Sequence, residues 1–214
     1  MVSVLVFSSY PLFRIGLVKA LEGLPDISIV GACDPDPEDA ALDFVQKNPA
    51  DVLVLDMCIM KGEYFDLVRR IKEINSNIKI IMLAAQNKEP IPTRFLKAGV
   101  DAYLTYRTDV GEVSKAITEV QQGNQYIGRD CAQTHALNRV AGPLVESPVA
   151  VLSERELQVM MMIIAGQRVA AISNSLSISP KTINTYRYRL FAKLDVDSDV
   201  SLTLLAIRHG LIEA

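Results

Sequence analysis

Short apolar runs alternate with amphipathic stretches over the first part of the chain. Apolar runs bounded by polar residues are typical of strands buried on both faces of a parallel sheet. The stretches between them repeat apolar residues at spacings of three and four, which predicts helices. The expected strands are 4–7, 27–32, 52–55, 78–83 and 102–104, and the expected helices are 11–21, 37–46, 65–74, one ending near Gly99, and 110–121. This pattern predicts an α/β domain with a doubly wound parallel sheet over residues 1–123.

The patterning fades between residues 124 and 149, where glycine, proline and serine indicate a linker with one helical turn near 131–140. Residues 150–214 are expected to form an all-α domain. Its first helix begins with a capping box, Ser153 facing Glu156, and ends at Gly166. Further helices are expected at 169–176, 179–194 and 198–209, so the tight turn at 177–179 predicts a helix-turn-helix.

The second helix of that pair, 179–194, suits the major groove of DNA. Ser179 is a good N-cap, and Ile183, Tyr186, Leu190 and Leu194 form the stripe expected to be buried. The other faces carry cations without an acidic residue among them. Candidates for reading base edges are Lys181, Asn184, Thr185 and Tyr188, and candidates for phosphate contacts are Ser179, Thr182, Arg187, Arg189 and Lys193.

Three segments of this domain resemble the LuxR-type DNA-binding domain that ends NarL/FixJ-class response regulators. They are LSERELQVM, ISPKTINTYRYRLFAKL and LLAIRHGLI. The YRYRLFAKL run and the pair Gly166-Gln167 are most similar to the GacA/UvrY group. The resemblance implies that helix 179–194 enters the major groove and that the last helix forms a dimer contact.

The order of elements in residues 1–123 resembles the flavodoxin-like receiver domain of response regulators. The segments around Pro11-Leu12, 51–56 and Ala98-Gly99 carry this similarity. In that family, an acidic pair after the first strand holds magnesium, and an aspartate after the third strand accepts a phosphoryl group. A Thr or Ser ends the fourth strand, and a lysine after the fifth contacts the phosphate.

This chain departs from the receiver pattern at most of those positions. Only the candidate phospho-acceptor Asp56 and the switch aromatic Tyr103 remain, whereas the other positions hold Ser8, Ser9, Ala84 and Tyr106. Hydroxyls bring no charge to a hard divalent cation, and phosphoryl transfer needs cations to neutralise oxygen charge. We therefore expect a degenerate receiver that has lost its magnesium site, uses no cofactor and is controlled without phosphorylation.

Other interpretations of these residues remain open. Asp56 could still be phosphorylated in a conventional way, or serve as a strand-end carboxylate that caps nearby amides. The altered pocket could respond to a small molecule or a partner protein. Cys58, two residues after Asp56, is a candidate redox sensor, although a filler role is favoured.

Composition fits a regulator outside the membrane. The net charge is −3, and residues 150–214 hold seven Lys/Arg against six Asp/Glu, leaving 15 against 19 in the rest. DNA binding must then depend on local clustering of cations. No apolar stretch is long enough for a transmembrane span, and Met1 leads directly into a strand without a signal peptide. Three cysteines without metal-ligand spacing and two histidines favour a cytoplasmic protein with no metal site.

The sequence thus predicts a dimeric transcription regulator that binds double-stranded DNA. The alternative is a protein-interaction module that pairs with a paralogous response regulator, and a sensor kinase is a further candidate partner. The sequence gives no support for an enzyme. It shows no cluster of a nucleophile with a base and no glycine-rich phosphate-binding loop.

Overall fold

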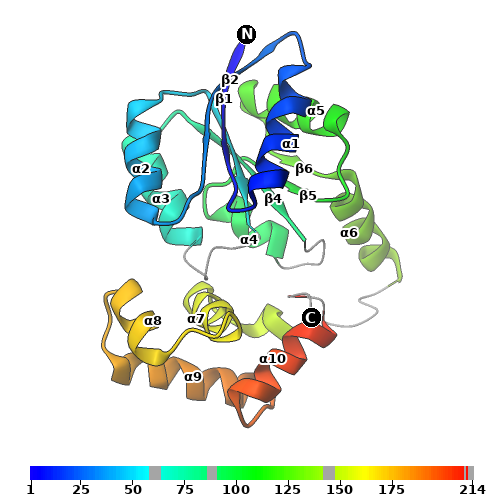
Figure 1. Ribbon diagram of the computed structural model, residues 1–214. Helices are drawn as coiled ribbons and strands as arrows, with labels where there is room; N and C mark the ends of the chain where they lie inside the picture. Colours follow the sequence, from blue (N-terminus) through cyan, green and yellow to red (C-terminus); the bar gives the residue numbers. More distant parts are fainter. Residues whose placement is uncertain (58–63, 86–90, 142–147, 210, 212–214) are drawn as a thin grey trace. The chain divides into compact units, whose positions relative to one another are not determined.

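The computed structural model describes residues 1–57, 64–85, 91–141, 148–209 and 211. These residues form two compact units. The first holds the strands and helices of residues 1–57, 66–85 and 91–141, and the second holds residues 64–65 and the helices of residues 148–209 (Figure 1).

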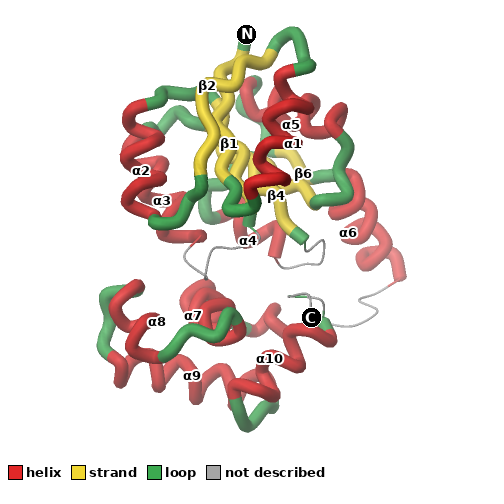
Figure 2. Tube along the Cα trace, viewed as in Figure 1, coloured by secondary structure: helices red, strands yellow, loops and turns green. Residues whose placement is uncertain are grey.

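The first unit is built on one parallel six-stranded sheet with the strand order β2-β1-β3-β4-β5-β6. Figure 2 draws the strands in yellow. Its strands are β1 (Val2–Phe7), β2 (Ile27–Cys33), β3 (Val52–Asp56), β4 (Lys79–Ala84), β5 (Ala102–Thr105) and β6 (Tyr126–Ile127). In register, Phe7 pairs with Leu55, Asp56 with Leu83, and Ala84 with Thr105. The carboxyl ends of β1, β3, β4 and β5 therefore lie along the same edge of the sheet.

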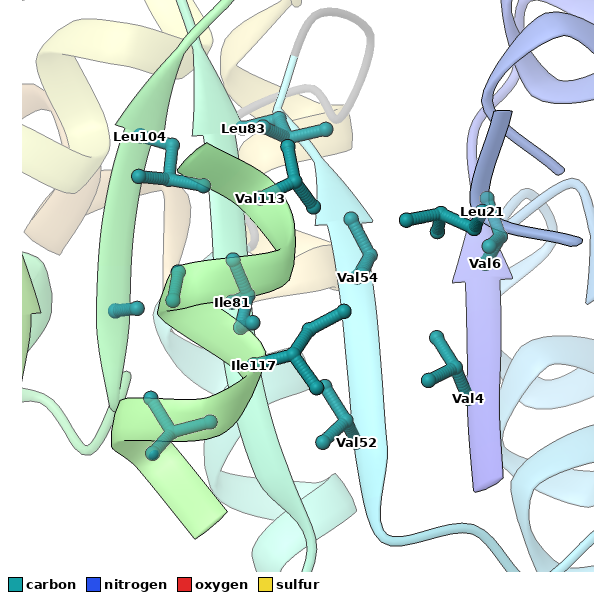
Figure 3. Packing of buried hydrophobic residues seen from close by; sticks show 13 residues of the cluster. Val4, Val6, Leu21, Val52, Val54, Ile81, Leu83, Leu104, Val113 and Ile117 are labelled. Atoms are coloured by element: carbon teal, nitrogen blue, oxygen red, sulfur yellow. The ribbon is translucent and has the colours of Figure 1, made fainter. Parts of the chain in front are cut away.

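Helices cover both faces of this sheet. On one face, α1 (Pro11–Glu22) and α5 (Val110–Gln121) pack against alternate strand residues. Figure 3 shows this cluster, which includes Val4, Val6, Leu21, Val52, Val54, Ile81, Leu83, Leu104, Val113 and Ile117. The intervening strand residues face α2 (Glu38–Lys47), α3 (Tyr64–Ile74) and α4 (Ile91–Lys97), as the contacts Phe7–Phe44 and Phe95–Tyr103 illustrate. Burial on both faces explains why the strands are continuously apolar, and the predicted doubly wound fold is confirmed.

The segment expected to be a linker is structured in its first half. Residues 126–127 form β6, whose backbone pairs in parallel with β5, and α6 runs over Arg129–Ala141. The sequence predicted a single helical turn near 131–140, and the helix observed there is longer. Two residues of strand give no periodic signal, and α6 has no clear apolar stripe, so the sequence pattern missed both.

The second unit is all helical. It contains the 3₁₀ helix η1 (Pro148–Val151) and the helices α7 (Glu154–Ile164), α8 (Val169–Ser175), α9 (Pro180–Leu194) and α10 (Asp199–Arg208). The capping box of Ser153 and Glu156 is present, and α7 stops before Gly166, whose φ of 77° suits glycine. Leu157, Met160, Ile172, Ile183 and Leu202 are among its fully or almost fully buried side chains.

Candidate functional site

Asp56 ends β3 at the carboxyl edge of the sheet with only 3% of its surface exposed. The Ser8 hydroxyl donates a hydrogen bond of 2.6 Å to its Oδ2, and the Tyr106 hydroxyl donates one to its Oδ1. Ser8 follows β1 and Tyr106 follows β5. Three of the residues that the sequence placed at this edge are thus in direct contact, and both oxygens of the carboxylate accept protein hydrogen bonds.

Further contacts hold Tyr106 beside Asp56. Its backbone N–H donates to the carbonyl of Ala84 at 3.1 Å, and its ring meets Phe13 of α1 edge to face with centroids 5.5 Å apart. Ala84 provides this carbonyl, but its methyl side chain cannot form a hydrogen bond. The strands β3, β4 and β5 and helix α1 therefore all position the Tyr106 phenol.

Ser9 is hydrogen-bonded elsewhere. Its hydroxyl donates at 2.6 Å to Oδ1 of Asp34, which follows β2, and the carbonyl of Ser8 accepts from the guanidinium of Arg14. Asp34 and Arg14 were not among the predicted site residues. The sequence could have indicated both residues, because Asp34 follows a predicted strand and Arg14 lies in the first predicted helix.

Thiol chemistry receives no support from Cys33, which ends β2. Burial raises the pKa of this thiol to about 11, while nearby Arg14 lowers it and Asp34 raises it. The thiol is therefore protonated at neutral pH and a poor nucleophile. Cys58, the candidate redox sensor, lies outside the described residues.

Two residues of β5, Tyr103 and Thr105, connect this edge of the sheet to α4 and α6. Tyr103 is fully buried and stacks on Phe95 of α4 with centroids 6.0 Å apart. The Thr105 hydroxyl donates at 2.6 Å to Asp130, in the first turn of α6. The end of β5 therefore contacts α6 through Thr105, and the residue that follows it contacts Asp56 through Tyr106.

In the second unit, α9 has the buried and exposed faces that the sequence indicated. Ile183, Leu190 and Leu194 are buried, whereas Tyr186, which was assigned to the core, is only half-buried. The Ser179 side chain accepts a hydrogen bond from the N–H of Thr182 and caps the helix. This capping bond lies in the first turn of α9, where both residues were predicted to contact phosphates.

The exposed face of α9 carries Lys181, Thr185, Tyr188 and Arg189, with Asn184 half-buried beside them. Within the described part of the chain, Lys181 and Arg189 form no ion pair. The Thr185 hydroxyl donates at 3.0 Å to the carbonyl of Lys181. Four of the predicted DNA-contacting side chains therefore lie together on one accessible surface.

Two of the predicted phosphate contacts are engaged within the domain. The Arg187 guanidinium forms two hydrogen bonds to the carboxylate of Asp199 in α10, at 2.6 and 2.8 Å. The Lys193 ammonium donates to Glu156 at 2.7 Å and to the carbonyl of Val151 at 3.2 Å. These cations join α9 to its neighbours, which the one-dimensional face pattern did not reveal.

Helix α10 leaves apolar side chains on its surface. Leu202 and Ala206 are buried, whereas Val200 and Leu204 are 69% and 49% exposed. Residues four apart lie on one side of a helix, so these two side chains form one exposed stripe. No helix within the described residues is long and apolar enough to cross a bilayer.

Comparison with known proteins matches both units. The family described as "Response regulator receiver domain" matches residues 4–118, and "Bacterial regulatory proteins, luxR family" matches residues 150–206. Response regulator UvrY of Escherichia coli K12 is 41% identical over 216 residues, which cover 100% of this chain and 97% of UvrY. Response regulator GacA of Pseudomonas aeruginosa is 35% identical over 214 residues, covering 100% of this chain and 99% of GacA.

Solved structures share the fold. RcsB from Salmonella enterica serovar Typhimurium, bound to promoter rprA in the presence of a phosphomimetic, has a TM-score of 0.77. The sequence identity is 22%, and the match covers 95% of this chain and 97% of RcsB. At this identity the likeness concerns the architecture alone.

Proposed function

Because the chain belongs to the DNA-binding response regulators, with a receiver domain and a luxR-type regulatory domain, we propose that it controls transcription without phosphorylation of Asp56. The observation that carries this proposal is that both carboxylate oxygens of Asp56 already accept hydrogen bonds from the protein. Hydroxyls of Ser8 and Tyr106 donate to its two oxygens.

The hydrogen bonds on Asp56 oppose its use as a nucleophile. An oxygen that attacks phosphorus must offer a lone pair, and a donor on that oxygen makes the lone pair less available. Tyr106 takes the place of the family's lysine and brings a neutral donor where phosphoryl transfer needs a cation. Moving the phenol away from Asp56 would also break its edge-to-face contact with Phe13 of α1.

The residues at this edge do not fit a magnesium ion. Magnesium prefers carboxylate oxygens in near-octahedral geometry. Here Ser8 and Ser9 provide hydroxyls, and the carboxylate that Ser9 contacts belongs to Asp34, after a different strand. We therefore propose that the receiver needs neither magnesium nor another cofactor.

The DNA-binding part of the proposal rests on α9. Its accessible face combines two cations, Lys181 and Arg189, with the amide of Asn184 and the side chains of Thr185 and Tyr188. Cations attract phosphates, and the polar side chains between them suit base edges. RcsB has been solved bound to promoter DNA, with the same overall architecture.

The first experiment is a binding titration of the purified chain against random duplexes at fixed salt, with and without acetyl phosphate and magnesium. We expect enrichment of one two-fold symmetric site, with an affinity that neither additive changes. Enrichment only with both additives, lost in Asp56→Asn, would show that Asp56 is a working phospho-acceptor. No enrichment under any condition would favour the protein-interaction module and a paralogous response regulator as partner.

A second experiment tests whether restoring the receiver family's residues makes Asp56 a phospho-acceptor. The changes Ser8→Asp, Ser9→Asp, Ala84→Thr and Tyr106→Lys together reinstate the family's residues. We expect this variant to incorporate phosphate from labelled acetyl phosphate, whereas the natural chain does not. Adding Asp56→Asn to the variant is the matched control, and it must abolish incorporation.

We further propose that the chain binds DNA as a homodimer in the cytoplasm, with α10 at the dimer contact. The exposed stripe of Val200 and Leu204 gives each copy an apolar surface for a two-fold interface. Leu204→Arg should weaken binding to a two-half-site duplex but leave binding to a single half-site unchanged. Equal loss on both duplexes would contradict a dimer role for α10. A sensor kinase is expected as a partner only if phosphorylation of Asp56 is found.

A further inference from the structure

The accessible face of α9 has an apolar centre. Tyr188 is 68% exposed. Among the described residues of α9, it is the one large hydrophobic side chain that is exposed. On a helix it neighbours Thr185, three positions before it, and Asn184, four positions before it. Lys181 and Arg189 bring charges close to this centre, so the phenol lies between groups suited to phosphates.

Thr185 contributes its methyl group to this centre. Its hydroxyl donates to the Lys181 carbonyl of the same helix at 3.0 Å. A hydroxyl turned toward the helix backbone is no longer free to donate to a base edge. The group of Thr185 that can meet an apolar ligand surface is its methyl, and its role in reading bases stays a prediction.

One base matches an apolar surface in the major groove. Guanine, cytosine and adenine present hydrogen-bond donors or acceptors there, whereas thymine adds a 5-methyl group. We propose that the Tyr188 ring and the Thr185 methyl together contact a thymine 5-methyl group and so determine sequence preference. This inference rests on the proposed DNA binding and names the chemical group that is read.

The test removes only that methyl group. In the duplex selected by the natural chain, each thymine is replaced singly by deoxyuridine, which keeps the base pair and lacks the methyl. Binding of the full chain is measured by fluorescence anisotropy at fixed salt. We expect about a fourfold weakening at one or two positions in each half-site, the amount expected for one buried methyl group, and no change elsewhere.

Variants assign the effect to the two side chains. Tyr188→Ala should bind the thymine and deoxyuridine duplexes equally, and Thr185→Ser, which keeps the hydroxyl but not the methyl, should reduce the difference. Tyr188→Phe should keep the full difference, because the ring and not its hydroxyl makes the contact. Arg189→Ala is the control, which should weaken both duplexes by the same factor.

The outcomes separate this inference from the function on which it rests. A selected duplex whose affinity ignores every deoxyuridine overturns the thymine contact and leaves DNA binding intact. A difference that persists unchanged in Tyr188→Ala means that other residues read the methyl. Loss of the difference in Tyr188→Phe means that the ring alone does not make the contact and that the hydroxyl is needed to hold it in place. Failure to select any duplex overturns the proposed function and the inference together.

Discussion

At the scale of single residues, Arg187 and Arg189 differ in surroundings although they lie two positions apart on α9. Arg187 is 30% exposed and paired with Asp199, and its guanidinium also lies 5.3 Å from the Phe191 ring centroid. Arg189 is exposed and forms no ion pair with any described residue. Arg187 thus fits a positioning role for α10, and Arg189 fits a phosphate contact.

Arg187→Ala should lower the stability of the second unit by up to about 1 kcal/mol, since partly exposed pairs contribute little more than this. Asp199→Ala should cost a similar amount, and the double variant should lose less than the sum of the two, because the ion pair that they share is lost only once. Thermal unfolding of the three variants measures this coupling. Additive losses would show that the two side chains act independently.

Arg189→Ala should leave thermal stability unchanged and weaken every duplex alike. The dependence of log affinity on log salt should become shallower by about 0.9, the value for one phosphate contact. Titrations at several salt concentrations measure that slope. An unchanged slope would remove Arg189 from the phosphate contacts.

Glu156 should make stability depend on pH. Burial alone would raise its pKa, but hydrogen bonds from Lys193 and Ser153 outweigh burial and hold the pKa below the usual 4.5. A carboxyl with a lowered folded pKa stabilises the fold above its unfolded pKa and loses that contribution as pH falls. Glu156→Gln should therefore cost about 1 kcal/mol at neutral pH, and the difference should shrink below pH 4.5 in thermal scans. A difference independent of pH would exclude this charge effect.

The sequence predicts residue positions better than residue partners. Strand-end logic brought Ser8, Asp56 and Tyr106 to one edge, because parallel register makes carboxyl ends coincide. It did not find that Arg187 reaches Asp199, 12 positions away, or that Lys193 reaches Glu156, 37 positions away. Long side chains choose partners from the packing of neighbouring helices, which a face pattern along one helix does not contain.

At the scale of elements, a buried carboxylate fastens the start of α6 to α5. Glu112 of α5 accepts hydrogen bonds from the Arg129 N–H at 2.7 Å and the Tyr126 hydroxyl at 3.2 Å. Together with the Thr105–Asp130 bond, this holds β6 and α6 on the sheet. The sequence did not indicate this arrangement, because it depends on single polar contacts rather than on an apolar repeat.

Glu112→Ala should loosen this part of the fold. The Arg129 N–H and the Tyr126 hydroxyl then lose the carboxylate that accepts their hydrogen bonds. The free energy of unfolding should fall by about 2 kcal/mol. Hydrogen exchange should accelerate over 126–134, while exchange in α9 stays constant. Thr105→Val is the matched comparison, which removes the hydrogen bond to Asp130 and the one accepted from the Arg107 N–H. It should accelerate exchange at the start of α6 to a smaller extent. Uniform acceleration through the chain would indicate global destabilisation instead.

At the scale of the whole molecule, each unit has its own core. Val6, Val54 and Ile81 belong to the sheet core, and Ile183, Leu190 and Leu202 are buried in the helical unit. A fragment of residues 148–214 should therefore fold alone and select the same DNA sequence as the full chain. Circular dichroism and duplex selection check this outcome. A folded fragment that selects a different sequence would show that the first unit shapes recognition.

The occupied carboxylate of Asp56 has a consequence for how information passes through this protein. Under the proposed control without phosphorylation, one way for this regulator to report a signal is through the amount of protein that the cell makes and degrades. Promoter occupancy then follows mass action, and pairing of two copies makes it rise more steeply than the protein concentration itself. Under that proposal, synthesis and turnover of the chain would set promoter occupancy in place of phosphoryl transfer to Asp56.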